Sequence, residues 1–305
     1  MSESVLKLRN VTKKYSQDYV LNDVNMTIKK GDIYGLIGRN GAGKTTLTRI
    51  VTSLIPNYDG SVELFGEKTK IGLKNAQKRI GAVIETPSLY PDLTAYQNLA
   101  YYQKLKGIVD KDIINKNLEI VDLSATSKLK FKNFSLGMKQ RLGIALVLLN
   151  NPDFIILDEP INGLDPMGII EMREIINTLN KDHNITILIL SHILTELSLV
   201  ATNYGFIEKG KLLKELTSVE LNNACNKSLI LNIDNASSAA TVLEEKIKTK
   251  NYKVTSKNEI RIYDFIDRAS EINSELVRAG INVIGISSTA ENLEDYFKNL
   301  IKEGN

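Results

Sequence analysis

The segment GRNGAGKTT, residues 38–46, restricts the possible folds more than any other part of the sequence. It follows the short apolar run IYGLIG and fits the pattern G-x-x-x-x-G-K-[ST], in which a strand leads into a helix. Its glycines let backbone N–H groups close around an anion, Lys44 adds a positive charge, and Thr45 offers a hydroxyl ligand to Mg²⁺. The helix expected from Lys44 to about Ser53 directs its positive end at the same place. The segment therefore predicts a nucleotide site made by Gly38, Arg39, Asn40, Gly41, Ala42, Gly43, Lys44, Thr45 and Thr46.

A second element is FIILDEP, residues 154–160, an apolar run that ends in two acids. Asp158 at the strand tip can hold Mg²⁺ through water, and Glu159 can orient or deprotonate an attacking water. The alternative is a strand that simply ends in two solvated carboxylates. A phosphate loop needs an acidic metal partner, which favours the catalytic interpretation.

The order of the elements predicts the fold class. Through the first two hundred residues, strand patterns alternate with helical patterns, which is typical of a parallel α/β sheet. The pattern of residues 92–131 predicts a helical insert. We expect one domain over 1–215 with a helical subdomain at about 86–150, and a linker over 216–227. Residues 228–305 show a βαββαβ order, which predicts a small ferredoxin-like α+β domain.

Composition limits the possible partners, disulfides and membrane-spanning segments of the chain. The formal charge of +3 is too small to indicate a nucleic-acid or anionic partner, and the lone Cys225 excludes an intrachain disulfide. The longest apolar stretches are shorter than the roughly 20 residues that span a bilayer. If membranes matter, we expect the chain to meet them through another protein.

Residues 134–146, FSLGMKQRLGIAL, resemble the signature of the ABC ATPase family, LSGGQ followed by Q-Q-R. Ser135 and Gly137 match the motif, whereas Leu136 and Met138 depart from it. In the family the signature contacts the γ-phosphate bound by the opposite subunit, so the resemblance implies a dimer with two shared sites. In isolation, the segment could also be an amphipathic helix broken by glycine, but its placement some 17 residues before FIILDE favours the signature.

Three further matches occur in the family's order. NGLDP, residues 162–166, resembles the D-loop, and its Asp165 would lie near the dimer seam. His192 follows the run ITILIL and resembles the switch histidine that touches the γ-phosphate. Tyr15 resembles the aromatic that stacks on adenine; the alternative is an ordinary surface or core tyrosine. His183 is expected in a solvated loop.

One position departs from the family's pattern. Where relatives carry a glutamine that ligates Mg²⁺ and links to the membrane subunit, this chain has Glu85. Together with SLGMKQR and the tail ENLEDYFKNLI, this substitution resembles the bacitracin- and lantibiotic-resistance branch of the family. The resemblance implies an α/β P-loop NTPase core of ABC type with Thr45, Asp158 and Glu85 as Mg²⁺ ligands.

The function implied is that of an ATP-binding and ATP-hydrolysing subunit of a transporter that exports, or protects against, peptide antibiotics. Lys44, Glu159 and His192 would be catalytic, with ATP and Mg²⁺ as cofactors. The partners implied are a separately encoded membrane permease and a second ATP-binding subunit, with no nucleic acid, at the cytoplasmic face of the membrane. Two alternatives stay open: a soluble ABC ATPase acting on ribosomes or DNA, and a nucleotide-dependent regulator.

Overall fold

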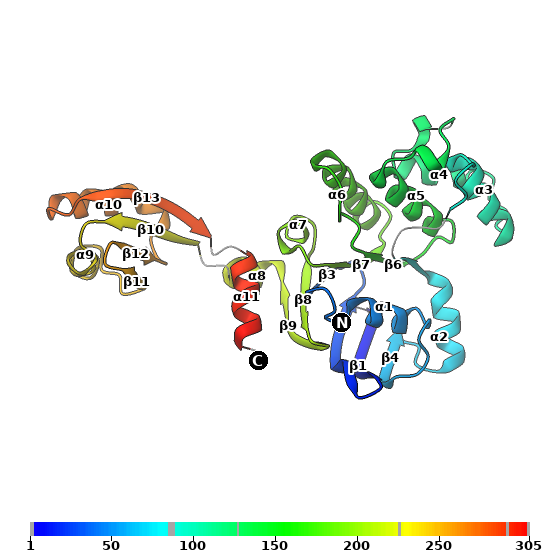
Figure 1. Ribbon diagram of the computed structural model, residues 1–305, viewed down its shortest axis with the longest axis horizontal. Coiled ribbons are helices and arrows are strands. Elements are labelled where there is room, and N and C mark those ends of the chain that lie inside the picture. Colours follow the sequence, from blue (N-terminus) through cyan, green and yellow to red (C-terminus); the bar gives the residue numbers. More distant parts are fainter. Residues whose placement is uncertain (1–2, 85–88, 127, 225–226, 291–292, 304–305) are drawn as a thin grey trace. The chain divides into compact units, whose positions relative to one another are not determined.

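A computed structural model describes residues 3–84, 89–126, 128–224, 227–290 and 293–303 of the chain (Figure 1). The chain divides into two compact units, 1–218 and 219–305. No helix within the described ranges is long and apolar enough to cross a membrane.

A six-stranded sheet forms the centre of the first unit, in the order β5-β6-β7-β3-β8-β9. Its five parallel strands are β3 (Ile33–Ile37), β5 (Ile80–Val83), β6 (Phe154–Asp158), β7 (Thr186–Ser191) and β8 (Asn203–Glu208). The central strands β3 and β7 are buried along their whole length, as their continuous apolar sequences require in a parallel sheet. Because parallel strands end at one edge, the residues that follow β3, β6 and β7 come together there.

The prediction of a parallel sheet is wrong for three of the expected strands. β1 (Ser4–Tyr15), β2 (Asp18–Lys29) and β4 (Asp59–Leu64) form a separate antiparallel sheet in the order β2-β1-β4. β9 (Lys211–Thr217) pairs antiparallel with β8. The physical reason is connection length: two residues separate β1 from β2 and β8 from β9, and so short a turn can only reverse the chain.

Three helices form the predicted helical subdomain: α3 (Ala95–Leu105), α4 (Ile113–Ile120) and α5 (Leu136–Leu148), which pack on one another. α3 begins with a capping box in which Thr94 and Gln97 satisfy each other's backbone N–H groups. Arg141 on α5 lies 3.3 Å from Oδ2 of Asp122, just after α4, and 3.5 Å from Oε2 of Glu171. Other α-helices in the described part of this unit are α1 (Lys44–Val51), α2 (Lys70–Ala76), α6 (Pro166–Lys181) and α7 (Leu194–Leu197).

Strand β3, which leads into the phosphate loop, is anchored by a partly buried hydrogen bond. The Tyr34 hydroxyl donates to Oε1 of Glu215 on β9 at 2.7 Å. Burial, and then the neighbouring Glu215 carboxylate, raise the pKa of Tyr34 well above its ordinary value. The hydroxyl therefore stays a neutral donor at physiological pH.

The second unit contains a four-stranded antiparallel sheet in the order β11-β12-β10-β13. Its elements follow one another as β10 (Lys227–Ile233), α9 (Ala236–Val242), β11 (Tyr252–Ser256), β12 (Glu259–Ile262), α10 (Ala269–Arg278) and β13 (Val283–Ala290). Apolar side chains from these strands and helices form a core of their own. α11 (Leu293–Glu303) follows β13.

The stretch 216–227, expected as a linker, contains regular structure. It includes the end of β9 and the helix α8 (Ser218–Ala224), in which Leu221 is buried.

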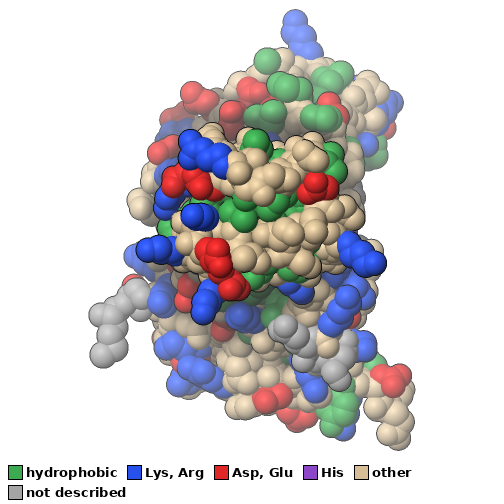
Figure 2. Space-filling model, turned by 90° about the vertical axis from the view of Figure 1, so that its left-hand side faces the viewer, with side chains coloured by type: hydrophobic (Ala, Val, Ile, Leu, Met, Phe, Trp, Pro, Cys, Tyr) green, Lys and Arg blue, Asp and Glu red, His purple; other side chains and the backbone are tan. Residues whose placement is uncertain are grey.

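On the face of the molecule drawn in Figure 2, Lys and Arg side chains are interspersed with Asp and Glu.

Candidate functional site

The loop between β3 and α1 is held in place by contacts from several directions. The backbone N–H of Gly38 donates to the carbonyl oxygen of Ser191 at 3.2 Å, which fixes the loop to the end of β7. The Lys44 ammonium folds back and donates to the Gly38 carbonyl oxygen at 2.5 Å. Gly43 has a φ of 105°, and a Cβ there would lie 2.7 Å from the carbonyl oxygen of Val20. This conformation requires glycine.

This loop lines a cavity of about 320 Å³ next to the two predicted acids. Its walls are Val20, Arg39, Asn40, Gly41, Ala42, Gly43, Lys44, Thr45, Thr46, Asp158 and Glu159. Backbone N–H groups at the start of α1 and the Lys44 charge suit this cavity to the phosphates of a nucleotide.

The two acids at the end of β6 have different neighbours. Oδ2 of Asp158 accepts a hydrogen bond from the Thr45 hydroxyl at 3.2 Å, so two of the three expected metal ligands lie side by side. Glu159 contacts Lys44, with 3.4 Å between Oε1 and Nζ, and His192, with 2.9 Å between Oε2 and Nδ1. The three residues expected to be catalytic therefore form one cluster.

The backbone at Glu159 is unusual. Its φ of 49° lies in the left-handed region, which residues other than glycine adopt at a cost. Its N–H donates to the carbonyl oxygen of Leu190 on β7 at 2.9 Å, which holds the turn. Strain of this kind, when it is observed, concentrates at functional sites, and here it aims the carboxylate at Lys44 and His192.

The signature segment and the predicted D-loop pack against each other at the starts of two helices. Ser135 caps α5 by accepting a hydrogen bond from the Met138 N–H, and Asp165 caps α6 by accepting one from the Gly168 N–H. A Cβ on Gly163 would lie 3.1 Å from the Leu136 side chain, so the two turns are in close contact. Within this one chain, the side chains of Ser135 and Asp165 act as helix caps.

The structure does not bring Tyr15 to the cavity at the phosphate loop. The Tyr15 ring is half exposed, lies 5.0 Å from the Lys13 ammonium, and is not part of the cavity wall. Val20, on β2, is one of the wall residues. Glu85 lies outside the described residues.

The sequence patterns did not predict that Gly210 supports the phosphate loop. Gly210, in the turn between β8 and β9, donates its N–H to the Ala42 carbonyl oxygen at 3.0 Å and accepts from the Asn22 N–H at 2.8 Å. The turn thus holds the phosphate loop and β2 together. The signal in the sequence was the KGK turn between two strand patterns, which by itself carries no chemistry.

Comparison with known proteins identifies the family. Residues 21–162 match the model of the ABC transporter family. The chain is 41% identical over 302 residues to the bacitracin transport ATP-binding protein BcrA of Enterococcus faecalis, covering 99% of this chain and 98% of that protein. The chain belongs to the ABC transporter ATP-binding proteins. The predicted resemblance is thereby confirmed.

Other ABC relatives agree with this assignment. The lantibiotic transport ATP-binding protein SrtF of Streptococcus pyogenes is 45% identical over 211 residues, covering 69% of this chain and 90% of that protein. Among solved structures, a dimeric ATP-binding cassette in a post-hydrolysis state, bound to ADP and Pi, has a TM-score of 0.61 at 26% identity. It covers 70% of this chain and 98% of that one. This ABC subunit therefore has the cassette fold, binds ATP, and hydrolyses it in a reaction coupled to transport.

Proposed function

We propose that this chain powers a transporter that exports, or protects against, peptide antibiotics of the bacitracin or lantibiotic type. The observation that carries the proposal is the identity to BcrA along nearly the whole chain, second unit included. The cluster of Lys44, Glu159 and His192 supports an active ATPase over a nucleotide-dependent regulator.

In the proposed reaction each residue of the cluster has a separate task. Lys44 and the loop amides hold the β- and γ-phosphates, and Glu159 orients and deprotonates the attacking water. His192, held by Glu159, reaches toward the γ-phosphate. The water's proton passes to the Glu159 carboxylate as the bond to the γ-phosphorus forms, and ADP leaves.

Mg²⁺ fits the residues present. It prefers hard oxygen ligands, and it is usually held by one or two protein groups together with substrate phosphates and waters. The Thr45 hydroxyl and the Asp158 carboxylate lie 3.2 Å apart at the rim of the phosphate cavity and supply such a pair. A bound Mg²⁺ would neutralise phosphate charge. We propose Glu85 as a further ligand from the sequence alone.

The proposed assembly is a homodimer of ATP-binding subunits bound to a separately encoded membrane permease at the cytoplasmic face. A dimeric cassette among the structural neighbours supports dimerisation. In a dimer, Ser135 and the residues that follow it would face the nucleotide bound by the partner subunit. Asp165 would lie at the dimer interface.

The decisive experiment expresses the chain with a separately encoded membrane permease in a bacitracin-sensitive host. We expect the pair to co-purify and to raise the bacitracin or lantibiotic concentration that stops growth, while the pair carrying Glu159→Gln co-purifies and gives no protection. Co-purification with ribosomes or DNA and no membrane partner would support the soluble alternative and refute the proposal.

A further inference from the structure

The basic residues of this chain are unevenly distributed. The formal charge of the whole sequence is +3, but residues 67–79 alone contain five Lys or Arg residues and a single acid, Glu67. This segment includes α2 and the short 3-10 turn Gln77–Arg79 that leads into β5. In Figure 1, α2 lies at the periphery of the first unit. The segment therefore makes a strongly positive local surface that the net charge of the chain does not indicate.

Three lysines of this segment lack an acidic partner. Lys68 and Arg79 form ion pairs, whereas no carboxylate in the described part of the chain pairs with Lys70, Lys74 or Lys78. The three lysines are exposed and follow one another at intervals of four residues, which places them on one side of the helical segment. Like charges at this spacing repel each other, so a polyanionic partner would stabilise the arrangement.

An exposed apolar side chain lies among these lysines. Ile71 on α2 is 79% exposed, and it precedes Lys74 by three residues, so the two lie on the same helix face. The other face of α2 carries the buried Ala76 and the half-buried Leu73, which pack on the core. A short amphipathic segment with lysines and a bare isoleucine on its solvent side is typical of a surface that rests on a membrane interface.

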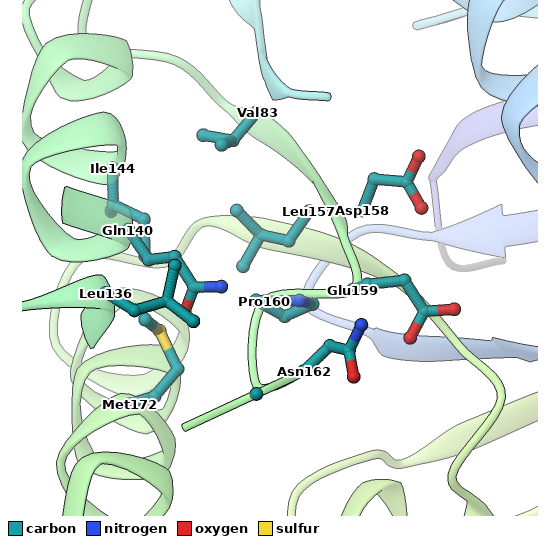
Figure 3. Close-up of a pocket in the computed structure, with 11 residues that line it drawn as sticks. Val83, Leu136, Gln140, Ile144, Leu157, Asp158, Glu159, Pro160, Asn162 and Met172 are labelled. Atoms are coloured by element: carbon teal, nitrogen blue, oxygen red, sulfur yellow. The ribbon is translucent and has the colours of Figure 1, made fainter. Parts of the chain in front are cut away.

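Lys78 also lines a hollow whose walls differ from those of a nearby apolar cavity. The cavity of about 370 Å³ drawn in Figure 3 has mostly apolar walls, and the carboxylates of Asp158 and Glu159 point away from it. The hollow has a volume of about 490 Å³, and no acid is found among its described wall residues. These residues are Lys78, Lys106, Ile108, Leu149, Asn150 and Asn151. Two ammonium groups and two side-chain amides around one space suit a phosphate group.

Lys106, at the C-terminal end of α3, extends the positive charge beyond α2. It too has no acidic partner within the described residues. Partial burial lowers the pKa of Lys106 below its ordinary value, because the ammonium has lost some of its hydration. An anion in the hollow would supply the counter-charge that the protein does not provide.

We propose that the lysine surface, formed by Lys70, Ile71, Lys74, Lys78 and Lys106, binds the phosphate groups of an anionic phospholipid surface. The lysines neutralise several headgroups at once, the hollow receives one phosphate, and Ile71 enters the boundary between headgroups and acyl chains. The choice of lipid over another polyanion rests on Ile71 and on the proposed function, since a permease partner would hold this subunit beside the membrane. A nucleic acid would contact the lysines but would leave Ile71 without a role.

Vesicle flotation with the full chain, in the absence of a permease, tests the lysine surface. Vesicles of phosphatidylcholine and phosphatidylglycerol in equal parts should bind the chain, and vesicles of phosphatidylcholine alone should bind little. The difference should shrink as salt is added, because salt screens the attraction. Lys70→Gln/Lys74→Gln should weaken binding to the mixed vesicles about 25-fold, at roughly fivefold for each lysine. Equal binding to both kinds of vesicle, or binding to neither, would overturn the proposal.

A matched control removes the same charge elsewhere. Lys253 and Lys257 are exposed residues of the second unit, and Lys253→Gln/Lys257→Gln should bind the mixed vesicles as the wild type does. Both double variants should keep the wild-type ATPase rate, because none of the four lysines lines the phosphate cavity, and this rate establishes that they are folded. An equal loss of vesicle binding in both double variants would show that net charge is the cause and would refute the lysine surface.

Ile71→Ser separates a lipid from other polyanions. It should weaken binding to the mixed vesicles and leave any binding to a DNA duplex unchanged, because only the lipid offers an apolar layer. Unchanged vesicle affinity in Ile71→Ser would contradict the lipid assignment. A wild-type chain that binds the duplex but not the mixed vesicles would assign the surface to nucleic acid and refute the proposal.

The vesicle result and the antibiotic result fail separately. The vesicles contain no permease, so a chain that protects its host but does not bind the mixed vesicles would refute the lipid surface alone. A chain that binds the mixed vesicles but gives no protection with the permease would refute the proposed function and leave the lipid surface standing.

Discussion

Oε2 of Glu159 lies 2.9 Å from Nδ1 of His192, and this contact joins the ends of the neighbouring strands β6 and β7. The other oxygen of the same carboxylate faces Lys44 at 3.4 Å. One side chain therefore links the two residues that the sequence places 148 positions apart, at 44 and 192. This geometry is compatible with the proposed role of Glu159 as the acceptor of the water's proton.

Glu159→Gln should retain ATP binding and lose turnover, by on the order of 10²- to 10⁴-fold, because glutamine keeps the shape but cannot accept the proton. Steady-state ATPase assays measure the loss. Size-exclusion chromatography with ATP should show an accumulated dimer, since the bound nucleotide persists. Glu119→Gln, an exposed glutamate on α4, is the control and should behave as wild type. Full activity of Glu159→Gln would remove the assigned role.

Lys44→Ala should weaken ATP binding by at least about tenfold, since a hydrogen bond to a charged group contributes about 1.5–3 kcal/mol. The ammonium is buried in the cavity wall and donates to the Gly38 carbonyl oxygen, so alanine removes a charge held inside the phosphate loop. Isothermal titration with ATP measures the change, and exposed Lys30→Ala serves as the comparison. Equal ATP affinity in the two variants would contradict the phosphate-loop assignment.

The sequence was sufficient to predict the elements that carry chemistry, because their signals are local. Gly38 to Thr46 must form a tight turn before a helix, and the apolar run ending in Asp158 must be a buried strand. Parallel strands then bring Asp158, Glu159 and His192 to one edge. These expectations needed no knowledge of distant contacts.

The remaining features depend on contacts between distant parts of the chain. The left-handed backbone at Glu159 is set by its bond to Leu190, and no pattern around residue 159 encodes it. Tyr15 and Val20 lie on successive strands, and only the pairing of β1 with β2 decides which of them lines the cavity. Likewise, the role of Gly210 arises from its contacts with Asn22 and Ala42, far away in the sequence.

Removal of the second unit should leave ATP binding intact. A chain that ends after Ser218 keeps β9, whose Thr217 pairs with Asn203, and it keeps every residue of the phosphate cavity. Its ATP affinity by titration should match that of the full chain. A chain that ends after Glu208 lacks β9 and Gly210 and should bind ATP poorly. Loss of binding in a folded 1–218 protein would show that the second unit takes part in the site.

The last prediction concerns the turn that holds the phosphate loop. Gly210 has a φ of 76°, and a Cβ there would lie 2.4 Å from the carbonyl oxygen of Val20. Gly66 has a similar φ of 84°, but a Cβ there meets nothing within 4 Å. Alanine at either position is strained by about 1–2 kcal/mol. Only at Gly210 does it also push the turn away from β2.

Gly66→Ala should therefore lower the free energy of unfolding by about that amount and leave ATP affinity unchanged. Gly210→Ala should lower it further and also weaken ATP binding, because the turn can no longer keep its hydrogen bonds to Ala42 and Asn22. Urea unfolding and ATP titration on both variants separate strain from lost contacts. If the two variants lose the same stability and both keep wild-type ATP affinity, backbone strain is the whole effect and the turn does not position the phosphate loop.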